Sequence, residues 1–188
     1  MKRITIFASG TGTNARAILQ HFRHNPGVKI EAIICNNPQA KVIDVAQEFQ
    51  VPYYLISKKE LNETENVVNL LKSSGTDLVV LAGFLLLIPE NILEAFPNRI
   101  INIHPALLPA YGGAGMYGSK VHQSVLQAKE KETGITIHYL NGKYDEGEII
   151  IQKKVAVDPE DNVETISRKV HELEHEWYPK IIEQLLAA

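Results

Sequence analysis

Residues 4–22 read ITIFASGTGTNARAILQHF, and this stretch decides the fold. A β-rich apolar run from Ile4 to Ala8 enters a turn that contains Gly10 and Gly12, and apolar residues then follow helical spacing as far as Phe22. Strand, glycine turn and helix in this order are typical of the first unit of a parallel α/β sheet. Glycines in such a turn let backbone amides approach a phosphate at the start of the helix.

The same alternation continues along the chain. Strands are expected at residues 28–35, 53–56, 78–82 and 100–103, and helices at residues 41–50, 65–73 and 89–96. The remainder predicts a helix at 119–131, strands at 135–140 and 148–155, and a long helix at 162–186. We therefore predict an α/β fold with a doubly wound, mostly parallel, Rossmann-like sheet, an antiparallel strand in its C-terminal part, and a single domain over residues 1–188.

Composition narrows the class of partner. The 188 residues include 19 Lys plus Arg and 22 Asp plus Glu, for a net charge of −3, and no long basic run occurs. Nucleic acid and membrane partners are therefore not expected, and small-molecule substrates are. The single cysteine, Cys35, excludes an intrachain disulfide and favours a cytoplasmic protein. The composition leaves the oligomeric state open between monomer and dimer.

The glycine turn predicts a site for an anion. Dinucleotide-binding proteins also need an acidic residue at the end of the second strand, where this chain has Cys35-Asn36-Asn37. A triphosphate loop needs a lysine after the glycines, and none is close. A cradle for a monophosphate fits better, built from small residues and a helix start, with Thr11, Thr13, Asn14 and Arg16 nearby. The alternative is that the glycines only make a tight turn.

A second candidate site follows the strand at 100–103. Asn102 and His104 are two residues apart, so their side chains share one face at the carboxyl end of the strand, where Pro105 ends it. An amide can stabilise an oxyanion, and an imidazole can move a proton near neutral pH. Asp145, in the turn at 141–147, is the acid best placed to orient and charge the imidazole. The alternatives are a histidine that only satisfies a loop and an ordinary turn aspartate.

These segments together resemble the phosphoribosylglycinamide formyltransferase family. The resemblance extends from Ile4 to about Leu185. Its most specific parts are SGTGTN at 9–14, DLVVLAGF at 77–84, NIHPALLP at 102–109, GITIHY at 134–139 and DEGEII at 145–150. The resemblance implies the formyltransferase fold and formyl transfer from 10-formyltetrahydrofolate, as cosubstrate, to glycinamide ribonucleotide in purine synthesis, without a metal.

The resemblance also implies a role for individual residues. Asn102, His104 and Asp145 fall on the family's catalytic trio. Gly12, Thr13 and Asn14 would bind the substrate phosphate, and Glu174 its ribose. The folate would contact Leu85, Leu86, Leu87, Ile88, Asn102, Asn141, Gly142, Lys143, Tyr144 and Asp145. Residues 1–100 would form the phosphate-binding half and residues 101–188 the catalytic and folate-binding half.

Other functions remain as alternatives at this point. A formyltetrahydrofolate hydrolase or another formyltransferase shares the trio but usually carries an additional domain, for which we expect 188 residues to leave no room. A non-enzymatic nucleotide-binding module would explain the glycine turn but not the trio. Many relatives carry basic residues in place of Leu86 and within the segment Asn62 to Asn66, so Lys58 or Lys59 would have to contact the folate's glutamate tail.

Overall fold

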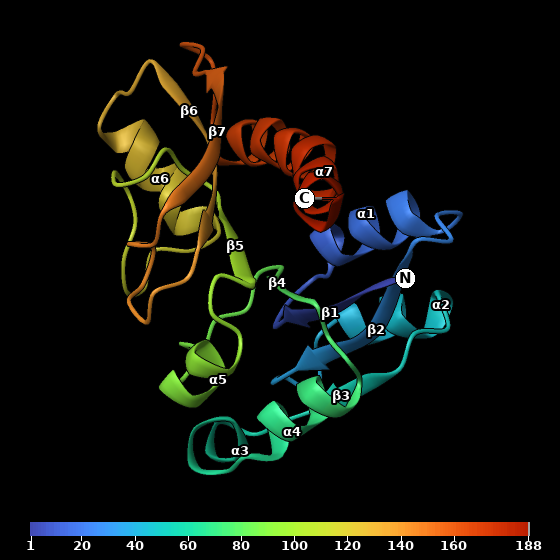
Figure 1. Ribbon diagram of the computed structural model, residues 1–188. Helices are drawn as coiled ribbons and strands as arrows, with labels where there is room; N and C mark the ends of the chain where they lie inside the picture. The colour runs from blue at the N-terminus through green and yellow to red at the C-terminus, as the bar shows by residue number, and fades with distance from the viewer. Residues whose placement is uncertain (188) are drawn as a thin grey trace.

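Strand β1 (Lys2–Ala8) lies inside a seven-stranded sheet in the computed structural model, which describes residues 1–187 (Figure 1). The strand order is β3-β2-β1-β4-β5-β6-β7. The other strands are β2 (Val28–Cys35), β3 (Tyr53–Leu55), β4 (Leu78–Leu81), β5 (Ile100–His104), β6 (Glu132–Tyr139) and β7 (Ile149–Ala156). Strands β1 to β5 pair in parallel, and β6 is antiparallel to both β5 and β7. The predicted sheet, with its antiparallel strand in the C-terminal part, is confirmed.

Helices cover both faces of the sheet. One face packs against α1 (Thr13–Phe22), α2 (Val42–Glu48), α6 (Ser119–Gln127) and α7 (Val163–Ala187). The other packs against α3 (Lys58–Glu63), α4 (Asn66–Ser73) and α5 (Glu90–Ala95). Within residues 1–187, no helix combines the length and the apolar character that a membrane span requires.

The winding of the sheet reverses between β1 and β4. These strands are neighbours, but the chain leaves β1 toward α1 on one face and leaves β4 toward α5 on the other (Figure 1). Loops that diverge in this way leave a crevice at the carboxyl ends of the strands, where α/β proteins bind ligands. Helix α7 is fixed beside this edge because the Tyr178 hydroxyl donates to the carbonyl oxygens of Leu81, at 2.9 Å, and Ile101, at 3.3 Å.

The structure corrects the prediction between residues 57 and 64, where the sequence analysis expected no element. Helix α3 occupies this stretch and begins with a capping box, in which Ser57 accepts from the Glu60 amide and the Glu60 carboxylate accepts from the Ser57 amide. The Ser-x-x-Glu pattern was the available signal. Helix α6 also ends at Gln127 instead of residue 131, because Lys129 adopts a φ of 55° that a helix does not accommodate.

Gly134 controls the pairing of β6 with β7. A Cβ atom at this position would overlap the backbone carbonyl oxygen of Lys153 and lie 2.9 Å from Leu107 Cδ2. We expect Gly134→Ala to lower the free energy of unfolding by about 2 to 3 kcal/mol, measured by urea denaturation. Gly10→Ala is the control, because no atom lies within 4 Å of its Cβ position. Equal unfolding midpoints for the two variants would contradict this account.

Candidate active site

A cavity of about 490 Å³ opens at the edge of the sheet where the winding reverses. Its walls come from the glycine turn after β1, the loop after β4, the end of β5, the loop before α6, the turn between β6 and β7, and one side of α7. The volume lies within the range of about 300 to 1,000 Å³ that is typical of small-molecule sites. The two sites expected from the sequence therefore share one cavity.

The glycine turn forms one end of the cavity. Gly12 has a φ of 75°, and a Cβ atom there would lie 2.8 Å from the Cα of Val42, so only glycine fits. Helix α1 begins at the next residue, and the amides of its first turn have no carbonyl partner within the helix. Such a helix start favours an anion. Arg16 does not contribute, because its guanidinium binds Glu48 at 2.6 and 2.7 Å and is absent from the cavity wall.

Glu174 faces the glycine turn from α7. Its carboxylate accepts a hydrogen bond of 3.0 Å from Asn14 Nδ2, and the residue is 5% exposed. Burial raises the pKa of Glu174 to about 7, although the bond from Asn14 opposes this shift. The packing of α7 on α1 brings residues 14 and 174 together, a contact that no local sequence pattern predicts.

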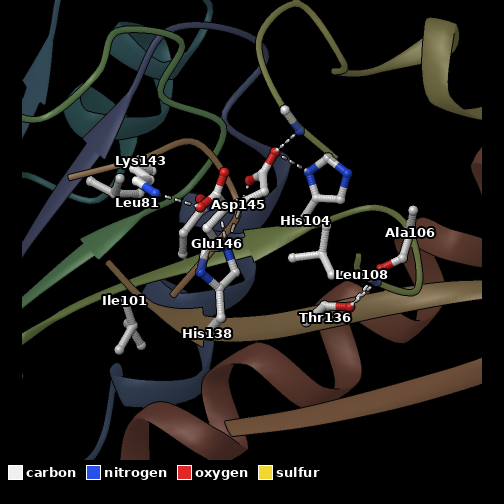
Figure 2. Close-up of polar contacts among 12 residues, drawn as sticks. Leu81, Ile101, His104, Ala106, Leu108, Thr136, His138, Lys143, Asp145 and Glu146 are labelled. Atoms are coloured by element: carbon white, nitrogen blue, oxygen red, sulfur yellow. Dashed lines mark hydrogen bonds and ion pairs between the residues drawn. The ribbon is translucent and has the colours of Figure 1, made fainter. Parts of the chain in front are cut away.

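Asn102, His104 and Asp145 all line the cavity. Figure 2 shows the side chains of His104 and Asp145 directed toward each other. His104 Nδ1 lies 3.4 Å from Asp145 Oδ2, and His104 Nε2 lies 2.8 Å from the carbonyl oxygen of Tyr111. Because a carbonyl only accepts, Nε2 carries the proton of the neutral ring and Nδ1 is the basic nitrogen. A proton added at Nδ1 would face the Asp145 carboxylate.

Asp145 is held in a defined position by its backbone and by a neighbouring loop. Its φ is 56°, and its Oδ2 accepts a hydrogen bond of 2.9 Å from the Gly113 amide. Burial acts to raise the pKa of Asp145, but His138, His104 and the Gly113 amide together bring this pKa below its ordinary value. Asp145 is therefore a carboxylate at neutral pH.

The electrostatics of His104 differ from expectation. The sequence analysis expected Asp145 to keep the imidazole charged. Burial lowers the pKa of His104 below its ordinary value, and the opposing effects of Asp145 and the Tyr111 carbonyl do not overcome it. The His104 ring, 4% exposed, is thus largely neutral at pH 7 in the free protein and available to accept a proton.

His138 belongs to the site, although none of the sequence patterns above selected it. It pairs directly with Asn102 across the antiparallel β5–β6 ladder. Its Nδ1 donates to the carbonyl oxygen of Tyr139 at 2.9 Å, which leaves Nε2 to accept from Asn102 Nδ2 at 3.2 Å. His138 Nε2 also lies 3.7 Å from Asp145 Oδ1 (Figure 2). Only the antiparallel register of β5 and β6 places His138 beside Asn102, and the periodicity of the sequence does not reveal that register.

One part of the cavity wall, the loop after β4, is apolar. It contributes Leu85, Leu86, Leu87 and Ile88, of which Leu85 and Leu87 are 46% and 39% exposed. Lys143 and Tyr144 also line the cavity, whereas Asn141 and Gly142 are absent from its wall. Asn141 instead braces the turn through bonds to Glu146 O and Lys143 N. Lys58 and Lys59, on α3, are not part of the wall either.

The cavity lies at the switch point of a doubly wound sheet. It combines a site for an anion with a neutral imidazole, an amide and a carboxylate, which is the arrangement of an enzyme of group transfer. Three comparisons make this class specific. The family model described as formyl transferase matches residues 2–182. The phosphoribosylglycinamide formyltransferase of Bacillus subtilis (strain 168) is 38% identical over 99% of this chain and 95% of its own length.

Solved structures agree with this match. The phosphoribosylglycinamide formyltransferase of Bacillus halodurans superposes with a TM-score of 0.87 at 36% identity, over 98% of this chain and 95% of that one. The corresponding protein of Anaplasma phagocytophilum gives a TM-score of 0.89 at 32% identity, over 98% of this chain and 86% of that one. The chain belongs to the formyl transferase family.

Proposed function

We propose that this enzyme transfers the formyl group of 10-formyltetrahydrofolate to the amine of glycinamide ribonucleotide in purine synthesis. The observation that carries the proposal is the sharing of one cavity by the glycine turn and by His104, with Asp145 3.4 Å from the basic nitrogen of the imidazole. The relatives named phosphoribosylglycinamide formyltransferase align over 98% to 99% of this chain, which supports the same function here.

Each substrate takes one end of the cavity in this proposal. The phosphate of glycinamide ribonucleotide binds the amides of Gly12, Thr13 and Asn14, and Glu174 accepts hydrogen bonds from the ribose hydroxyls. The folate ring system covers the exposed side chains of Leu85 and Leu87 and extends toward the turn at 141–145. The two substrates then meet at Asn102 and His104.

The two halves of the chain have separate tasks in a single domain. Residues 1–100 supply the phosphate cradle and the apolar wall, and residues 101–188 supply the trio and the ribose-binding Glu174. The fold needs no disulfide, and the buried Cys35 thiol suits the cytoplasm, where we place the enzyme.

The reaction proceeds through a tetrahedral intermediate. The substrate amine forms a bond to the formyl carbon, and the carbonyl electron pair moves to oxygen, where the Asn102 amide donates a hydrogen bond. His104 Nδ1 takes a proton from the new ammonium group, and Asp145 stabilises the resulting imidazolium. The bond from carbon to N10 of the folate then breaks, N10 receives the proton from His104, and the carbonyl re-forms on the product.

A formyl-transfer assay tests the function directly. With 10-formyltetrahydrofolate present, we expect tetrahydrofolate to form rapidly only when glycinamide ribonucleotide is supplied. Equal rates of formate release without any acceptor would identify a hydrolase instead. Binding of a dinucleotide, with no response to glycinamide ribonucleotide in a thermal-shift assay, would favour a binding module.

Glu174 supplies a test in which binding and stability change in opposite directions. We expect Glu174→Gln to raise KM for glycinamide ribonucleotide tenfold or more, because the amide replaces one oxygen acceptor with a donor. The same change removes a buried carboxylate whose pKa is about 7. Between pH 4.5 and 7 the folded chain holds a proton that the unfolded chain has lost, so this residue's contribution to stability falls as pH rises and is lowest above pH 7.

We therefore expect the ligand-free Glu174→Gln variant to be more stable than the unmodified protein at pH 8, by up to about 3 kcal/mol, with the difference vanishing near pH 4. Urea denaturation at both pH values measures it. Glu172→Gln is the control, because Glu172 lies two positions away on the exposed side of α7. A variant with unchanged KM at pH 8 would exclude the ribose contact.

A further inference from the structure

His122 is a buried histidine that the mechanism above does not use. It lies on α6, three residues after Ser119 and therefore on the same face of the helix, and both residues line the cavity. The residue is 2% exposed, and its Nδ1 has no hydrogen-bond partner among residues 1–187. An enclosed polar atom without a partner costs free energy, so such atoms are rare unless a ligand supplies the bond.

The surroundings of His122 show which part of a ligand is near it. Burial lowers the pKa of His122 to about 4, and repulsion from His171 and His104 when they are protonated acts in the same direction. His104 belongs to the reacting end of the cavity, and His171 Nε2 lies 3.9 Å from the ribose-binding Glu174. His122 therefore lines the same cavity as His104 and Glu174, the residues proposed to contact the two ends of the acceptor substrate.

The ring is neutral at pH 7 and carries one donor and one acceptor nitrogen. In glycinamide ribonucleotide, the group between the ribose and the reacting amine is a secondary amide, which also carries one donor and one acceptor. We propose that His122 is a positioning residue that hydrogen-bonds this amide and so aligns the amine with the formyl carbon. This inference rests on the proposed function and adds a determinant of acceptor specificity to it.

The test compares two ligands that differ in the amide. Ribose 5-phosphate retains the phosphate and ribose but lacks the amide. We expect His122→Phe to weaken binding of glycinamide ribonucleotide about tenfold, measured by calorimetry, and to leave the affinity for ribose 5-phosphate within twofold. His122→Asn, which keeps a donor and an acceptor, is expected to recover most of the loss. Exposed His24, replaced by Phe, is the matched control.

Kinetics and stability complete the design. The KM for 10-formyltetrahydrofolate is expected to stay within twofold in His122→Phe, and the melting temperature not to fall, since no hydrogen bond within the protein is lost. Equal weakening of both ligands, or of neither, would overturn the assignment of His122 while leaving formyl transfer intact. If the unmodified protein binds no glycinamide ribonucleotide, it is the proposed function that fails.

Discussion

His104→Ala is expected to lower kcat for formyl transfer by about 10² to 10⁴-fold, the range typical of a lost general acid–base group. His104 has a basic nitrogen in the cavity, Nδ1, and once protonated this nitrogen faces the Asp145 carboxylate at 3.4 Å. Without it, the ammonium formed by amine attack must lose its proton to water in a largely enclosed site. Steady-state kinetics with saturating concentrations of both substrates measures the effect.

The binding of the acceptor substrate should change little in this variant. The polar partners of His104 are Tyr111 and Asp145 and not the phosphate cradle or Glu174, so we expect the affinity of His104→Ala for glycinamide ribonucleotide to remain within a few-fold of the original. His24→Ala, on the surface after α1, controls for loss of a histidine as such. Full turnover in His104→Ala would remove the basis of the assigned mechanism.

Local patterns were sufficient to place the two parts of the site that lie on single strands. The glycine turn follows β1 and the Asn102–His104 pair ends β5, and both lie at carboxyl ends that the parallel topology brings to one edge. Period-two alternation also predicted that Asn102 and His104 share a face, and both line the cavity. Ile101 and Ile103 pack in the core on the α1 side, although Ile103 also reaches the cavity wall.

Local sequence patterns did not predict the features of the site that depend on burial or on contacts between residues distant in the sequence. The role of Glu174 followed only from the family resemblance, because it depends on packing of α7 against α1. His138 was not selected from the sequence because its position beside Asn102 depends on the antiparallel register of β5 and β6. The prediction that His104 is charged was wrong. The sequence suggested Asp145 as a carboxylate partner, but it did not reveal the burial that opposes the effect of this partner.

Asp145→Asn is expected to have the second large effect on catalysis. The backbone conformation at residue 145 makes asparagine a suitable replacement. Asp145 has a φ of 56°, which asparagine adopts more readily than most residues, and an asparagine oxygen can still accept from the Gly113 amide. The substitution therefore removes the charge with little change in shape. We expect kcat to fall by about 10² to 10³-fold, because the imidazolium formed at His104 loses the adjacent negative charge.

The pH profile of Asp145→Asn separates this electrostatic role from a structural one. The acidic limb of kcat, measured with both substrates saturating so that Glu174 is already occupied, reports the loss of a proton from His104, whose pKa burial has already lowered. The Asp145 carboxylate raises that pKa, so its removal lowers it further, and the limb should move to lower pH while the plateau falls. Glu146→Gln, at an exposed carboxylate paired with Lys143, should leave both unchanged. A lower plateau without a shifted limb would mean that Asp145 only shapes the turn, since the loss of its charge must otherwise weaken His104 as a base.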